Sequence, residues 1–203
     1  MSDRVYAGLR LQERVSQRRR QLLDAALEVF GTAGWAGSTV QDVCSAAGLS
    51  TRYFYEVVDS REDLFLLLIR ELAAEVEATV LGMLPTAQDP QERAAAVLAG
   101  LHDYFTTDPR RIRVALMESL ATEQFRQERR RLLRTFSELG ARLMRPLHTG
   151  IANGAPPRRR LELSAGLLTG AVVEALIAWE DEPTAREPLI RHLTALYTAA
   201  ARL

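Results

Sequence analysis

Residues 38–56 read STVQDVCSAAGLSTRYFYE and contain two short apolar patterns separated by a glycine. From Val40 to Ala47 the apolar residues recur at the three- and four-residue spacing of one helix face, and Gly48 ends the pattern. The Ser-Thr pair in front of it can cap this helix, and Ser50 is placed to cap a second short helix that begins with TRYFYE. The stretch therefore predicts two helices joined by a tight turn.

Helical spacing continues through the rest of the chain, and the alternation typical of strands is missing. Capping residues and prolines mark several helix starts, such as Ser60 before an acidic first turn and Asp89-Pro90 before the next helix. The sequence NGAPP at 153–157 predicts a loop. We therefore expect an all-α fold of about nine helices: near 18–33, 40–47, 51–56, 61–84, 90–105, 110–120, 122–145, 159–181 and 186–202.

Composition allows one large domain or two modest ones in a chain of 203 residues, of which 47% are hydrophobic and 26% charged. The 26 basic and 26 acidic side chains cancel, so net charge indicates no partner. Their distribution is more informative, because the first 20 residues hold six arginines against only Asp3 and Glu13. The N-terminus is therefore predicted to be a basic arm.

Two short helices joined at a glycine form a helix-turn-helix, whose second helix enters the DNA major groove with its N-terminal residues. Arg52 lies in that first turn and can donate two hydrogen bonds to a guanine. Phe54 should point into the core, while the Tyr55 hydroxyl reaches a phosphate. We expect the DNA contacts to come from Thr39, Ser50, Thr51, Arg52, Tyr53, Tyr55 and Arg61.

Enzyme and membrane functions find little support in the sequence. The three histidines are scattered, and neither a HExxH motif nor a phosphate-binding loop occurs, so we expect no catalysis, no cofactor and no metal. The single cysteine, Cys44, fits a reducing cytosol and a cytoplasmic protein. The apolar stretch at 163–179 is short for a membrane span and contains Glu174, which predicts a buried helix instead.

Residues 18–65 resemble the DNA-binding domain of the TetR family of bacterial transcriptional regulators. The resemblance covers an apolar first helix, a Thr-Val-x-Asp second helix, an Ala-Gly-Leu-Ser turn, an aromatic third helix and an acidic start to the fourth. It implies a basic arm at 1–17, a helix-turn-helix domain at 18–65 and a ligand-binding and dimerisation domain at 66–203. A homodimer would then bind a palindromic operator in double-stranded DNA as a repressor, and a small apolar effector would control it. The alternative is a helical adaptor or ligand-binding protein that does not bind DNA.

Residues in the long second part can be assigned to two further sites. Small residues in the helix near 159–181 allow another helix to approach closely, and with the last helix they predict a four-helix bundle across a two-fold axis. Aromatic and methionine side chains of the middle helices are candidates to line an apolar pocket. The predicted interface residues are Gly166, Gly170, Val173, Ile177, Leu193 and Leu196; the predicted effector residues are His102, Phe105, Met117, Phe125, Phe136 and Met144.

Overall fold

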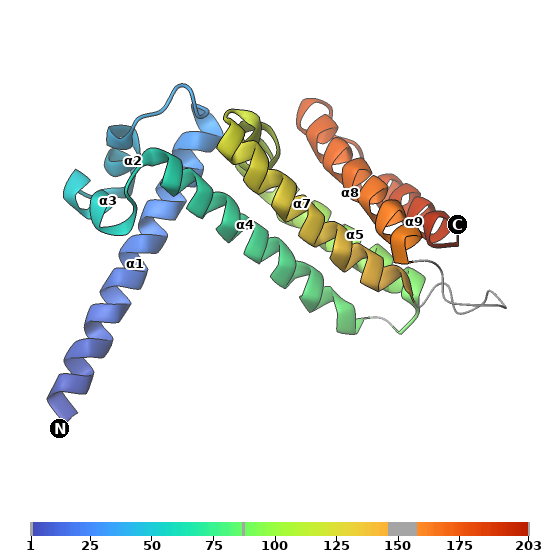
Figure 1. The fold of residues 1–203 in the computed structure, drawn as a ribbon, viewed down its shortest axis with the longest axis horizontal. Coiled ribbons are helices and arrows are strands. Elements are labelled where there is room, and N and C mark those ends of the chain that lie inside the picture. Colours follow the sequence, from blue (N-terminus) through green and yellow to red (C-terminus); the bar gives the residue numbers. More distant parts are fainter. Residues whose placement is uncertain (1, 87, 146–157, 203) are drawn as a thin grey trace. The chain divides into compact units, whose positions relative to one another are not determined.

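The protein is all-α, as predicted (Figure 1). A computed structural model describes residues 2–86, 88–145 and 158–202, and these ranges contain nine α-helices and no strand. The predicted loop at 153–157 lies outside the described residues. The α-helices are α1 (Ser2–Thr32), α2 (Val40–Ala47), α3 (Thr51–Val57), α4 (Arg61–Met83), α5 (Pro90–Thr107), α6 (Arg110–Ile112), α7 (Glu123–Met144), α8 (Arg158–Asp181) and α9 (Arg186–Arg202).

The chain divides into two units at Arg70–Glu71, so the first ten residues of α4 belong to the first unit and the remainder to the second. In the first unit, α1, α2, α3 and the start of α4 surround an aromatic core. The rings of Phe30, Trp35 and Phe65 lie 5.4 to 5.6 Å apart, mostly edge to face, which suits the charge distribution of aromatic rings. This packing joins α1 and the loop after it to the start of α4, while the two other helices of the unit, α2 and α3, are too short to be stable alone.

Helix α1 extends much further toward the N-terminus than its predicted start near residue 18. It begins at Ser2, so the arginine-rich segment expected to form an arm is part of one 31-residue helix. Only the later part of α1 carries a regular apolar stripe, with Leu22, Ala26 and Phe30 buried in the core of the first unit. The charged early part lacks that stripe, which explains why apolar spacing did not indicate a helix there.

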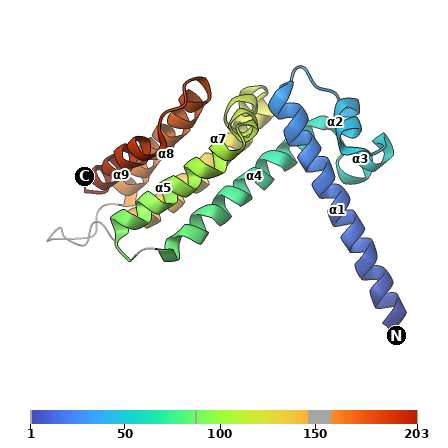
Figure 2. The same cartoon turned by 180° about the vertical axis from the view of Figure 1, so that it is seen from behind.

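The second unit contains the C-terminal part of α4 and helices α5 to α9. Helix α7 packs along α8, and α5 packs along α9 (Figure 2). Two apolar clusters form between these helices. The first, which we call the central cluster, consists of the buried residues Val76, Phe105, Ile112, Leu116 and Leu176. The second consists of Ala141, Met144, Leu161, Ala165 and Ala201.

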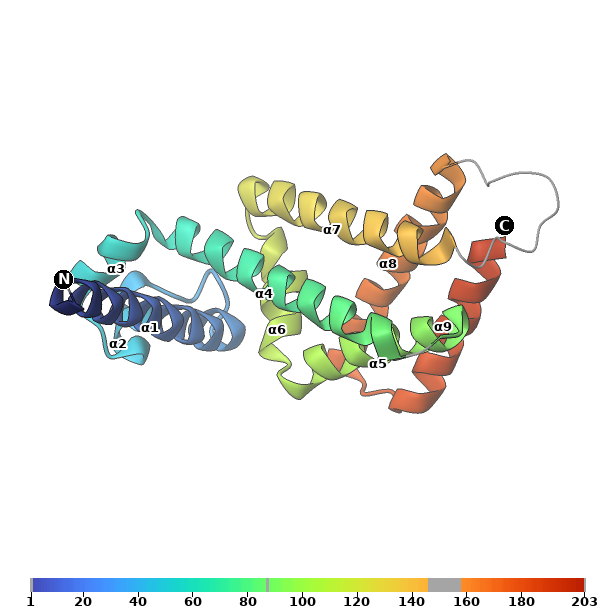
Figure 3. The same ribbon diagram turned by 90° about the horizontal axis from the view of Figure 1, so that it is seen from below.

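The segment predicted as one helix at 110–120 has a mixed geometry, and Figure 3 labels its first turn, α6. A single α-helical turn, α6, is followed by a π-helical segment, η2 (Arg113–Met117), and a 3₁₀ turn, η3 (Glu118–Leu120). Ile112, Val114 and Leu116 are all buried, so side chains pack on more than one side of this segment. Tertiary packing here overrides the regular period that the sequence suggested.

Helix α8 is less covered than the predicted buried helix. Over Arg159–Asp181 this helix is long enough and apolar enough to cross a membrane. Within its most apolar 18-residue stretch, only 22% is buried in the described structure. Leu163 and Leu167 are 65% and 69% exposed, one turn apart on the helix. The second unit therefore presents an apolar helix face that the described residues leave exposed.

Candidate functional site

The start of α2 is fixed by a reciprocal cap between Thr39 and Asp42. The Thr39 hydroxyl accepts a hydrogen bond from the Asp42 amide at 3.2 Å, and the Asp42 carboxylate accepts one from the Thr39 amide at 2.8 Å. The sequence left Ser38 and Thr39 as possible caps, and the structure selects Thr39. Ser38 is buried, and its hydroxyl donates to the Trp35 carbonyl. Thr39 is therefore exposed at the N-terminus of α2, where free amides attract phosphate oxygens.

The turn between α2 and α3 depends on Gly48. Its φ of 64° lies in the left-handed region, which glycine adopts without a steric penalty. The Gly48 and Leu49 amides donate to the carbonyls of Ser45 and Cys44, which closes the end of α2. Ser50 occupies the predicted N-cap position of α3, but its side chain makes no capping hydrogen bond. The bend is short, since only the three residues 48–50 separate α2 from α3.

Side chains on α3 separate into an exposed set and a buried one. Phe54 has no exposed surface, as predicted, whereas Thr51, Arg52 and Tyr55 are exposed. The Arg52 side chain is 87% exposed, and its Nε lies 3.3 Å from the Glu56 carboxylate. Such a surface pair holds an arginine only weakly, so its guanidinium is accessible at the helix start. All three exposed residues belong to the set predicted to contact DNA.

Tyr53 makes a contact that the sequence did not indicate. The Arg18 guanidinium of α1 lies over its ring, 4.1 Å from the centroid. The cation contacts the ring face, and Tyr53 is half-buried as a result. The contact joins the basic part of α1 to the first turn of α3, so both elements are positioned together.

Arg61, expected to contact a phosphate, is engaged inside the first unit. Its guanidinium lies 3.8 Å from the centroid of the Trp35 ring. It also donates hydrogen bonds to the carbonyls of Trp35 and Ser38, in the loop between α1 and α2. Arg61 thereby connects the first residue of α4 to the segment that leads into the Thr39 cap.

We predict that Arg61→Ala lowers the free energy of unfolding of the first unit by about 2 kcal/mol, because a charged hydrogen-bond donor and a cation–aromatic contact are lost. Urea unfolding measures this through Trp35 fluorescence in a Trp179→Phe parent, since the chain contains two tryptophans. Arg52→Ala is the matched control and should leave stability within about 0.5 kcal/mol. A different result would show that Arg61 acts on DNA instead. Arg61→Ala would then keep its stability, and the dependence of its DNA affinity on salt concentration would fall by the amount expected for about one lost phosphate contact.

The six predicted effector residues do not form a single group. Phe105 belongs to the central cluster, and Phe136 packs against it. The centroid of the His102 ring lies 6.2 Å from that of Trp179, which also packs against the cluster. Met144 lies in the second cluster, and Met117 is exposed. Phe125 is fully buried at the start of α7. Helical spacing identified these residues as apolar but did not indicate which of them share one helix interface.

Tyr104 is a polar member of this region. Its hydroxyl donates to the Glu75 carboxylate of α4 at 2.7 Å, while the Arg111 guanidinium lies 4.3 Å from the ring centroid. Burial, together with the bond to Glu75, raises the pKa of Tyr104 well above its usual value, so the hydroxyl keeps its proton. Its position one residue before Phe105 gave no sign that it would meet a carboxylate 29 residues earlier.

The predicted interface residues fall into two groups. Gly166 and Gly170 lie on the uncovered side of α8, where an added side chain would meet nothing within 4 Å, and Leu196 of α9 is exposed. Val173 and Ile177 pack against the central cluster, and Leu193 is buried. The sequence missed the two most exposed leucines of α8, Leu163 and Leu167. Their one-turn spacing was a usable signal, but α8 is apolar on several sides and spacing alone did not select a face.

A helix-turn-helix unit joined to a larger helical unit with an apolar core defines a DNA-binding transcriptional regulator. Residues 22–68 match the family of bacterial regulatory proteins described as the tetR family. The first unit therefore carries the N-terminal domain of tetR-family regulators.

Relatives of known function are also regulators. The chain is 29% identical to the transcriptional regulator BetI of Agrobacterium fabrum over 77% of this chain and 75% of that one. It is 25% identical to the transcriptional repressor NicS of Pseudomonas putida over 72% and 69%. BetI of Rhizobium meliloti is 31% identical, but that match spans only 40% of either chain.

Solved structures share the fold. The fatty acid degradation regulator FadR of Bacillus halodurans superposes with a TM-score of 0.78 at 19% identity, covering 89% of this chain and 94% of that one. FadR of Bacillus subtilis, solved with stearoyl-CoA, gives a TM-score of 0.77 at 18% identity over 89% and 98%. At these identities the likeness supports the fold and carries no information on the ligand.

Proposed function

We propose that this protein is a cytoplasmic homodimeric repressor that binds a palindromic operator and is controlled by a small, largely apolar effector. The observation that carries the proposal is the start of α3, where Arg52 is almost fully exposed behind a tight turn. Thr39, Ser50, Thr51, Tyr53 and Tyr55 surround it as candidate DNA contacts. Arg61 acts in this proposal by positioning the loop before α2.

A dimer is required because one short helix reads only a few base pairs. Two recognition helices about 34 Å apart reach successive major grooves, so a two-fold protein reads a palindrome. The exposed leucines of α8, the open surface at Gly166 and Gly170, and exposed Leu196 on α9 support a two-fold contact through these helices. The contact would cover apolar surface that the chain leaves in water.

Effector control is supported by the apolar central cluster, to which α4 contributes Val76. Helix α4 also supplies Arg61 and Phe65 to the first unit, so one continuous helix has residues in both cores. An effector that binds one conformation of α4 more tightly than another would change the free energy of operator binding. The change can be no larger than the difference in the effector's binding free energy between the two conformations.

We predict that Arg52→Ala removes base discrimination at one position in each half-site, by about 1–3 kcal/mol, because a two-bond contact to guanine is lost. The operator is first obtained by selection from random DNA with the full-length protein. Titration of operators that carry single base-pair changes then measures discrimination. Tyr55→Phe serves as a comparison and should weaken binding to every sequence equally, since it removes a phosphate contact.

Two results would oppose the proposal. An unchanged base preference in Arg52→Ala would show that another residue reads the operator. Recovery of no DNA sequence at low ionic strength would favour the helical adaptor that does not bind DNA.

A further inference from the structure

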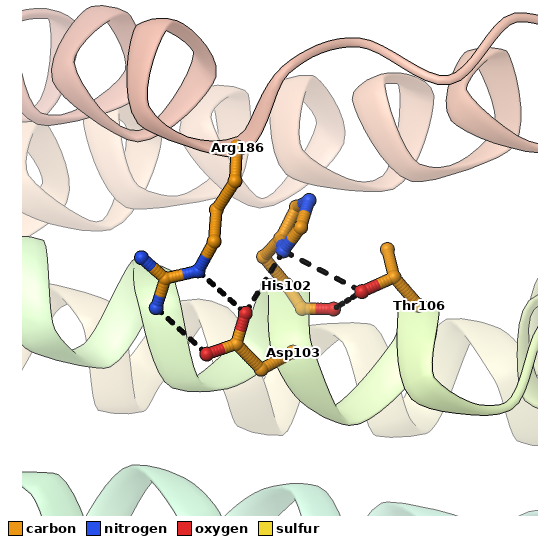
Figure 4. Close-up of polar contacts among 4 residues, drawn as sticks. All are labelled: His102, Asp103, Thr106 and Arg186. Carbon is orange, nitrogen blue, oxygen red and sulfur yellow. Dashed lines mark hydrogen bonds and ion pairs between the residues drawn. The ribbon is translucent and has the colours of Figure 1, made fainter.

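His102 on α5 is a buried polar side chain whose two ring nitrogens have different surroundings (Figure 4). Its side chain is 9% exposed. Nδ1 lies 3.1 Å from the Asp103 carboxylate and 3.5 Å from the Thr106 hydroxyl. Nε2 is buried and has no hydrogen-bond partner among residues 2–86, 88–145 and 158–202. One nitrogen is therefore held by the protein, and the other is left unsatisfied.

Asp103 is in turn held by Arg186 at the start of α9. The guanidinium donates two hydrogen bonds to the carboxylate, at 2.6 and 2.7 Å. This contact lowers the pKa of Asp103 to about 2, so the carboxylate is ionised and can only accept hydrogen bonds. The Arg186–Asp103 pair thus presents a fixed acceptor to Nδ1 of the imidazole.

A fixed acceptor at Nδ1 determines which nitrogen of a neutral imidazole carries the proton. Nδ1 must hold it in order to donate to Asp103, and Nε2 then has a lone pair. The Thr106 hydroxyl does not supply a competing proton, because it donates to the His102 carbonyl at 2.9 Å. In the neutral ring Nε2 is therefore an acceptor, and no described residue donates to it.

The His102 ring has an aromatic neighbour that packs against an apolar cluster. The Trp179 ring meets the imidazole edge to face, and Trp179 packs against the central cluster. A buried acceptor without a partner is destabilising, so a molecule that supplied a donor there would recover stabilisation that the free protein lacks. An acceptor-only group such as an ester or a carboxylate would face the same lone pair and recover nothing.

We propose that Nε2 of His102 binds the polar group of the effector, and that the effector is a largely apolar molecule carrying a hydrogen-bond donor, such as a hydroxyl or an N–H group. The assignment rests on the effector control proposed above and adds the chemical class of the ligand. Asp103 and Arg186 are positioning residues in this site, since they act on the ligand only through the imidazole. The apolar body of the effector lies against the central cluster.

The test uses three small probes of one shape: phenol, which has a donor, and anisole and benzoate, which have none. Ring nitrogens of histidine are followed by ¹⁵N NMR in the full-length protein, and loss of one signal in His102→Gln assigns the residue. His192→Gln is the matched control, because His192 is an exposed histidine on α9. We expect Nε2 of the free protein to be unprotonated. Phenol should shift its signal with a dissociation constant about tenfold below that of anisole, and benzoate should leave it unchanged.

Two results would overturn this proposal. One is a proton on Nε2 in the free protein, and the other is an Nε2 signal that responds to phenol no more than to anisole. Neither would affect operator binding, which is measured separately with the selected DNA. If the ring signals behaved as expected but phenol-like ligands never released DNA, effector control would fail and the donor site would stand.

Discussion

Leu167→Glu is expected to weaken operator binding by about 100-fold or more, because it places a charge in the proposed two-fold contact. Leu167 is 69% exposed in the single chain, next to the open surface at Gly166 and Gly170. In a dimer a glutamate there would be buried without a partner, which costs several kcal/mol. Monomers would then bind half-sites separately and lose the 10²- to 10⁴-fold gain of linked binding.

Sedimentation of the full-length variant measures its oligomeric state, and fluorescence anisotropy with the selected operator measures affinity. Leu81→Glu is the matched control, since Leu81 of α4 is also exposed, at 47%, but lies outside α8 and α9. It should remain dimeric and keep operator affinity within a few-fold. A dimeric Leu167→Glu protein with normal affinity would contradict the proposed interface.

Phe54→Ala is expected to lower the free energy of unfolding of the first unit by about 3–5 kcal/mol, a large share of the stability of a small domain. Phe54 has no exposed surface, and Val43 and Cys44 of α2 are buried as well. Removing its ring leaves a cavity beside two helices that are only eight and seven residues long. DNA binding should fail along with folding, because α3 has no other deeply buried side chain.

The Trp179→Phe parent again allows Trp35 to report urea unfolding of the first unit. Tyr55→Ala provides the comparison, since it removes the neighbouring ring, which is exposed and lies 5.2 Å from that of Phe54. That change should cost no more than about 1 kcal/mol of stability. Equal losses in the two variants would mean that α3 is not anchored by Phe54.

Local signals in the sequence predicted most of the helices. Thr39, Ser50 and Asp89 each stand at the N-cap position, and Gly48 ends α2 in the left-handed conformation. These signals act within a few residues, through single hydrogen bonds or one steric preference, and can therefore be read without knowledge of the fold. The helix starting at Ser2 was missed because its early part has no apolar stripe.

The candidate sites depended on contacts between residues distant in sequence. The exposed arginine on α3 was predictable from the turn in front of it. The engagement of Arg61 with a loop 23 to 26 residues earlier was not. The predicted effector residues fell into several groups, and the predicted interface residues included both covered and uncovered positions. The reason is that apolar spacing identifies which side chains avoid water but not which helix covers them.

The sequence by itself determined an all-α chain with a helix-turn-helix that exposes Arg52, because caps, glycines and short apolar periods are local properties. Tertiary structure alone decided that His102 would have one nitrogen held by Asp103 and the other unsatisfied. It also decided that Arg186 would reach a carboxylate 83 residues earlier, and that Leu163 and Leu167 would remain uncovered. The physical reason is that burial and pairing of a side chain depend on which distant helices pack against it, and no local pattern specifies those partners.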